Sequence, residues 1–153
     1  MSVPDDAVRA AFSRWACGVA VVAVRDEGRV YATTVSSLAT LSIDPPQLVL
    51  SLSPGAQVLP FLPEGASFGV SVLAASQRRT ATVFADPFPV GPSPFADGDP
   101  PRVEGALVSM VCRVAALHDA APARLVVARV EAVRTGDEER ALVRWRREWH
   151  ALP

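Results

Sequence analysis

The sequence contains no lysine, so all fifteen of its basic residues are arginine, and Schiff-base chemistry on a lysine is excluded. Positive charge is not in excess either. Sixteen acidic residues leave a net charge of −1 at pH 7, which argues against a broad electrostatic surface for nucleic acid. At 153 residues the chain has the length of one domain, 1–153, and it can bury a core without disulfides or a metal.

Cysteine and histidine are scarce, with two of each. Two cysteines without clustered histidines do not form a zinc site, so no metal is expected. The sequence shows no Ser-His-Asp spacing or paired-carboxylate motif that would indicate hydrolysis. Cys17 and Cys112 lie in strongly apolar stretches. We interpret them as two buried thiols that act as small apolar side chains, with a disulfide as the alternative.

The sequence also lacks an apolar run of membrane-spanning length. Residues 18–24 form the run GVAVVAV, which is too short to cross a bilayer. The first six residues are acidic rather than basic, and the apolar segment of a signal peptide does not follow them. We therefore expect a cytoplasmic protein with no membrane partner.

What the sequence does contain is a succession of short, β-branched apolar runs separated by turn residues. Strands are predicted over residues 18–24, 30–32, 47–52, 67–73, 106–115, 125–132 and 140–152. Helices are predicted over residues 5–16 and 75–84, with a short helix over 57–62. Residues 118–124 are predicted to join the two long strands. Because strands follow one another without regular β-α alternation, the pattern favours a mainly antiparallel β-barrel with helices over its ends.

Proline and glycine are concentrated in residues 86–102, DPFPVGPSPFADGDPPR, which excludes regular structure over most of this stretch. A loop of this length in a compact domain is usually mobile or functional. Phe88 and Phe95 lie within it. We expect both rings to anchor the loop to the core, with capping of a pocket as the alternative.

Four segments occur in a characteristic order. They are AFSRWACGVAVVAV (11–24), TTVSSLATLSIDPPQLVLSLS (33–53), FGVSVLAASQRRTATVFA (68–85) and VEGALVSMVCRVAALHDA (103–120), and RREWHAL closes the chain. Together these segments resemble the flavin reductase family, and the resemblance covers nearly the whole chain. It implies an antiparallel split β-barrel and a homodimer that binds flavin at the dimer interface.

The resemblance also implies a set of site residues. Those that bind the cofactor are Thr34, Val35, Ser36, Ser37, Ser51, Leu52, Ser53, Gln77, Arg78, Arg79 and Trp149. Small hydroxyls and backbone N–H groups at close approach suit the edge of a flavin ring, which carries alternating acceptors and donors. Arginines at a helix start suit a phosphate. Arg124 and His118 are the candidate catalytic residues, and Arg124 is suited to the phosphate of a nicotinamide cofactor.

The sequence departs from the family pattern at three contact sites. Ser36 stands where the family has asparagine, and residues 56–58, AQV, replace a basic and hydroxyl-bearing stretch that would hold a phosphate. A Gly-Asp-His triplet associated with nicotinamide binding falls here on residues 121–123, APA. Hydride transfer asks little acid–base help from the protein, so these changes do not by themselves exclude reduction.

The resemblance implies an NAD(P)H-dependent flavin reductase that supplies reduced FMN or FAD to a partner monooxygenase. Two alternatives remain at this stage. One is a split barrel that holds flavin as a bound cofactor and acts on a small metabolite. The other is a repurposed barrel without flavin, whose pocket binds a small organic ligand.

Overall fold

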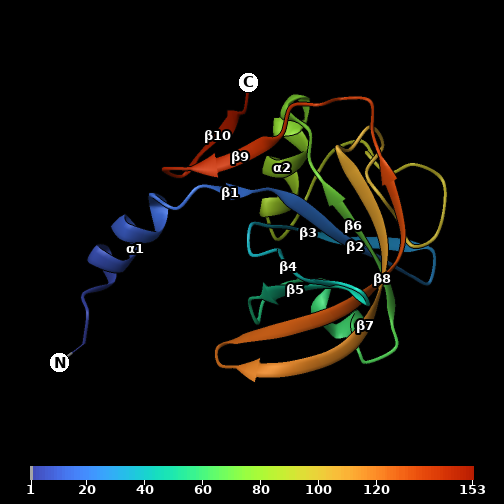
Figure 1. The fold of residues 1–153 in the computed structure, drawn as a ribbon, viewed down its shortest axis with the longest axis horizontal. Coiled ribbons are helices and arrows are strands. Elements are labelled where there is room, and N and C mark those ends of the chain that lie inside the picture. The colour runs from blue at the N-terminus through green and yellow to red at the C-terminus, as the bar shows by residue number, and fades with distance from the viewer. Residues whose placement is uncertain (1) are drawn as a thin grey trace.

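The computed structural model describes residues 2–153, and strands dominate it (Figure 1). The helical elements are α1 (Asp5–Ser13), η1 (Leu59–Phe61), η2 (Ala75–Gln77) and α2 (Arg78–Ala85). The strands are β1 (Cys17–Gly18), β2 (Ala20–Asp26), β3 (Arg29–Val35), β4 (Ala39–Ile43), β5 (Pro46–Leu52), β6 (Ser67–Val72), β7 (Val108–Ala120), β8 (Ala123–Thr135), β9 (Leu142–Trp145) and β10 (Glu148–Ala151). No helix of this part of the chain has the length and apolar character needed to span a bilayer.

Seven strands form one antiparallel sheet in the order β3-β2-β6-β7-β8-β5-β4, and β1-β9-β10 form a second, smaller sheet. Residues from strands near both ends of the larger sheet share one buried cluster, to which β3 contributes Val35 and β5 contributes Leu48, Leu50 and Leu52. The sheet is therefore curled around this cluster. The predicted antiparallel β-barrel is confirmed.

Residues 19–24 of the run GVAVVAV form most of β2 and its lead-in, and they are buried on both faces. Val22 and Val24 point into the barrel cluster, whereas Val21 and Ala23 belong to a second cluster with residues of α2. Successive strand side chains point to opposite faces, so a strand covered on both sides reads as a continuous apolar run. In Figure 1, α2 lies between the larger sheet and the β9-β10 hairpin.

The predicted helix 5–16 ends at Ser13, β4 was not predicted, and two further boundary predictions are wrong. Residues 140–152 form the hairpin β9-β10 rather than one strand, and its turn places Arg146 and Arg147 at φ values of 50° and 64°. The left-handed region is rarely adopted by residues other than glycine, so no turn signal is visible in the sequence. The segment 118–124 is mostly strand, because β7 and β8 pair down to Ala120 and Ala123.

The proline-rich loop, residues 86–102, lacks regular elements as predicted, and two contacts near its start and middle fasten it. Gln57 Nε2 donates a hydrogen bond to the carbonyl of Pro87. The ring of Phe95 packs against Phe84 with 5.4 Å between centroids, which confirms its anchoring role. The prediction for Phe88 is wrong, because 79% of that residue is exposed.

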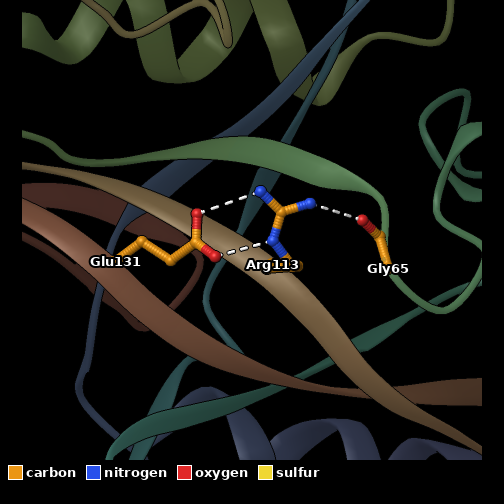
Figure 2. A network of polar contacts seen from close by, with 3 residues as sticks. All are labelled: Gly65, Arg113 and Glu131. Carbon is orange, nitrogen blue, oxygen red and sulfur yellow. Dashed lines mark hydrogen bonds and ion pairs between the residues drawn. The ribbon is translucent and has the colours of Figure 1, made fainter.

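A polar network on the outer face of β7 and β8 joins both strands to a turn before β6 (Figure 2). Arg113 donates to Glu131 from Nε (2.6 Å) and Nη2 (3.2 Å), and its Nη1 donates to the carbonyl of Gly65 (2.8 Å). The hydrogen bond from Arg113 holds the pKa of Glu131 below its usual value. Because the pair is exposed, it contributes little to stability and orders the surface of the hairpin.

Both cysteines are free. Cys112 is buried, and burial, reinforced by the negative charge of Glu131, raises the pKa of its thiol to about 12. It therefore stays protonated at neutral pH and acts as an apolar side chain, as expected. Cys17 is only half-buried, contrary to expectation, and its Sγ lies 3.7 Å from the carbonyl oxygen of Trp15.

Candidate functional site

The fold brings the two hydroxyl-rich segments of the sequence together. Ser37 follows the end of β3, and Ser51 lies near the end of β5. Ser37 Oγ donates to the carbonyl of Ser51 (2.8 Å) and accepts from its N–H (3.1 Å). Residues 34–37 and 51–53 therefore meet at the end of the barrel, where the serines form one surface and the side chains of Val35 and Leu52 are buried in the core beneath it. We call this surface the hydroxyl site.

Helix α2 lies beside the hydroxyl site and is joined to it by Thr34. The hydroxyl of Thr34 donates to the carbonyl of Ala81 in α2 (2.8 Å), so it positions the helix and is engaged within the protein. Arg78 and Arg79 are exposed at the start of α2. Gln77 is used structurally, since its Oε1 accepts from the N–H of Ala74 (3.0 Å) and its Nε2 donates to the carbonyl of Glu104 (2.8 Å).

Trp149 reaches the same helix from the C-terminal hairpin. Its Nε1 donates to Thr82 Oγ1 (3.0 Å), and the guanidinium of Arg144 lies 4.3 Å from its ring centroid. Trp149 also packs against the cluster beneath α2. The hairpin turn is fixed to α1, because the N–H of Arg146 donates to the carbonyl of Ser13 (2.6 Å).

A groove of about 290 Å³ lies between α1 and the β9-β10 hairpin, and Ser36 of the hydroxyl site lines it. Phe12, Trp15, Arg144 and Arg147 also line this groove. Sequence reasoning did not assign the two arginines to a site. The alternation of arginine with tryptophan in RWRREW was the signal available, but only the hairpin shows which arginines face Ser36.

The strand register places both candidate catalytic residues near the hydroxyl site, because the start of β8 pairs with the end of β5 and with the end of β7. Arg124 is the register partner of Leu52 on β5 and of Asp119 on β7. Its side chain is on the face that carries Leu52, its Nε is buried, and that Nε lies 3.1 Å from Asp119 Oδ1. Arg124 thus places a cation at the end of the barrel, next to residues 51–53.

His118 occupies the neighbouring row. It pairs with Leu125, which pairs in turn with Ser51, so the imidazole is on the opposite, outer face of the sheet from Arg124. His118 is exposed. The register therefore separates the two candidate catalytic side chains, although they lie near each other along the hairpin.

A second cleft of about 400 Å³ lies under the proline-rich loop, between the start of β3 and α2. Arg29, Tyr31, Gln57 and Phe88 are among the residues that line it. A smaller cleft of about 180 Å³ shares one wall with it and adds Arg79. Sequence reasoning placed neither Arg29 nor Tyr31 in a site, because nothing local distinguishes them from ordinary strand residues.

Comparison with known proteins gives a consistent result over the length of the chain. The family described as flavin reductase like domain matches residues 12–153. The reductase component of 4-hydroxyphenylacetate 3-monooxygenase from Thermus thermophilus is 34% identical over 147 residues, which cover 96% of each chain. An NADH-dependent flavin reductase from a Rhodococcus species is 33% identical over 138 residues, covering 81% of this chain and 73% of the relative.

Solved structures agree. The flavin reductase component of a bacterial two-component tryptophan halogenase superimposes with a TM-score of 0.85 at 30% identity, covering 98% of this chain and 99% of that one. The styrene monooxygenase flavin reductase from Pseudomonas putida S12 gives a TM-score of 0.84 at 30% identity, with 95% and 96% covered. The split barrel, the hydroxyl site and these matches lead to one conclusion: the chain belongs to the flavin reductase family.

Proposed function

We propose that this protein is a single-domain, cytoplasmic, NADH-dependent flavin reductase that supplies reduced FMN or FAD to a partner monooxygenase. The observation that carries the proposal is the hydroxyl site, where Ser37 and Ser51 join two separate segments beside α2. The relatives point the same way, since they are named as NADH-dependent flavin reductases and as reductase components of monooxygenases.

The donors at the hydroxyl site suit a flavin ring. Ser36 and Ser37 lie beyond the last paired residue of β3, Val35, and both are exposed. Among residues 2–153, the backbone hydrogen bonds outside strands and helices include none from either serine. Their N–H groups are therefore available to the acceptors on a ring edge, which need close approach by backbone or small hydroxyl donors.

When bound, the flavin supplies the hydride-accepting chemistry and NADH supplies the hydride. The protein's contribution is to position the two rings. In this proposal, Ser36 and Ser37 orient the flavin edge, and Arg124 binds a cofactor phosphate at the end of the barrel by charge-assisted hydrogen bonds. Arg78, Arg79 and Trp149 complete the surroundings on the α2 side. His118, on the outer face, has the weaker case for contact with the nicotinamide cofactor.

This proposal predicts that the purified protein binds FMN or FAD in a fluorescence titration and oxidises NADH only when flavin is added. A protein that carries flavin through purification, with turnover independent of added flavin, would favour the bound-cofactor alternative. Failure to bind either flavin would contradict both flavin-based functions.

We further propose that the protein is a homodimer whose second copy covers α1. This helix stands away from the barrel (Figure 1), and none of its residues is buried. Phe12 is 68% exposed, and Trp15, just beyond the helix, is 72% exposed. Isolated helices of this length are marginal in water, so the apolar face of α1 requires a partner surface. Because the resemblance to the flavin reductase family implies a homodimer, we assign this partner surface to a second copy of this chain.

Replacing both Phe12 and Trp15 by glutamate should halve the molecular mass in solution, as measured by sedimentation equilibrium. The matched control is Val133→Glu, which alters an apolar residue of β8 that is 62% exposed and leaves α1 intact. A wild-type protein with the mass of one chain would contradict the proposed dimer.

A further inference from the structure

The turn between β9 and β10 gathers arginine side chains at one edge of the molecule. Its sequence is RWRR, and it lies against the end of α1 (Figure 1), because Trp145 Nε1 donates to the carbonyl of Arg14 (3.2 Å). The guanidinium of Arg146 lies 4.6 Å from the ring centroid of Trp145, a contact that orders the cation without neutralising it. Arg14, Trp145, Arg146 and Arg147 are all exposed. We call these four residues the arginine turn.

The positive charge of the arginine turn has no acidic partner in the described part of the chain. The ion pairs there include none of Arg14, Arg146 and Arg147. The acidic residue of the hairpin, Glu148, has its carboxylate 3.7 Å from His150 Nε2. Exposed guanidinium groups without an internal partner suit carboxylates from another molecule, which they bind by charge-assisted hydrogen bonds.

The backbone of the turn is strained at the two residues that carry the charge. Trp145 pairs with Glu148, so Arg146 and Arg147 alone form the loop, and their φ values are 50° and 64°. A residue with a Cβ pays free energy in this left-handed region, and two-residue hairpin turns of this kind prefer asparagine and glycine. Strain that better turn residues would relieve points to a function of the side chains that are present.

The arginine turn lies beside the opening of the hydroxyl site. Arg147 lines the groove of about 290 Å³ between α1 and the hairpin, and Ser36 lines the same groove. A protein bound at the turn would therefore sit next to the residues to which the proposed function assigns the flavin edge.

The occupant that the charges favour is an acidic protein surface. A second copy of this chain carries the same positive turn, and like charges oppose contact between the two turns. The apolar residues Phe12 and Trp15 are the part of this region that we assign to the second copy. A nucleic acid or an anionic membrane requires a broad basic surface, which a chain with a net charge of −1 does not favour.

We propose that the arginine turn docks an acidic segment of the protein that takes up the reduced flavin. The inference rests on the proposed function, which supplies that partner in the form of a monooxygenase. Charge attraction at the turn would raise the rate of association and hold the acceptor beside the groove that contains Ser36.

The experiment uses labelled poly-L-glutamate as the acidic probe and measures its Kd by fluorescence anisotropy at low ionic strength. Arg146→Asn/Arg147→Gly is expected to raise this Kd roughly tenfold or more, because both guanidinium groups are lost. The same variant should unfold at a higher urea concentration, because asparagine and glycine relieve the strain of the turn. Arg146→Lys/Arg147→Lys keeps both charges and should retain most of the affinity.

The matched control is Arg129→Gln/Arg134→Gln, which removes the same charge from two exposed positions of β8 and should leave the Kd of poly-L-glutamate unchanged. If the control weakens binding as much as the turn variant, binding follows net charge and the inference is overturned. It is also overturned if wild-type protein does not bind poly-L-glutamate, or binds only oligothymidylate or phosphatidylglycerol vesicles. A protein that binds no flavin would instead overturn the proposed function.

Discussion

Replacing Gly69 by alanine is expected to lower the free energy of unfolding by roughly 2–4 kcal/mol, enough to threaten folding of a domain this size. Gly69 lies in the middle of β6, and a Cβ built there would overlap the carbonyl oxygen of Pro101. The backbone of Pro101 cannot easily retreat. It is buried, and the N–H of Val103 is held by Ser71 Oγ at 2.8 Å.

Urea denaturation of Gly69→Ala and of a matched glycine variant measures this effect. Gly55→Ala is the control, because a Cβ at Gly55 would meet open space and the position does not require a positive φ. Its stability should change by less than about 1 kcal/mol. Equal stability of the two variants would show that the loop does not cross β6 as closely as described.

Replacing Arg124 by alanine is expected to raise either the KM of NADH or the Kd of the phosphorylated flavin (FMN or FAD) by roughly ten- to hundredfold. A hydrogen bond to a charged group is worth about 1.5–3 kcal/mol, and Arg124 is the cation nearest to Leu52 and Ser53 in the strand register. Hydride transfer itself does not require the guanidinium. The effect should therefore fall mainly on KM rather than on kcat.

Two further variants separate a binding role from a structural one. Asp119→Ala removes the partner of Arg124 (Nε to Oδ1, 3.1 Å) and leaves the guanidinium free to bind phosphate, so activity should persist. Arg124→Lys keeps the charge without the planar fork and should restore part of the affinity. If Asp119→Ala lowers activity as much as Arg124→Ala, the ion pair stabilises the structure of the hairpin, and Arg124 does not bind the phosphate directly.

The barrel itself could be predicted from the sequence because its signals are local. Each of three segments has a single interpretation: the run GVAVVAV predicts a buried strand, residues 26–28 predict a turn, and residues 86–102 predict an irregular loop. The errors fell where a tertiary feature overrides the local signal. Arg146 and Arg147 turn the last hairpin without glycine, and β7 and β8 extend through polar residues because they pair with each other.

The site could be predicted only in part. The resemblance pointed to residues 34–37 and 51–53, and two hydrogen bonds of Ser37 Oγ show how Ser37 and Ser51 meet. No sequence pattern could place Arg29 beside residues of α2 and the proline-rich loop, because this cleft is assembled from three segments far apart in the chain. The half-buried position of Cys17 was also missed, because Cys17 lines a groove formed by α1, Ser36 and the β9-β10 hairpin, which are far apart in the chain.

The measurement that tests the central claim most directly is anaerobic mixing of the protein with NADH and an excess of FMN or FAD. A flavin reductase should remove the visible absorption of oxidised flavin as NADH is oxidised, with one flavin reduced for each NADH consumed. Neither change should occur at an appreciable rate when the protein is omitted. If the protein leaves both flavins oxidised, or oxidises NADH equally well without flavin, it is not a flavin reductase.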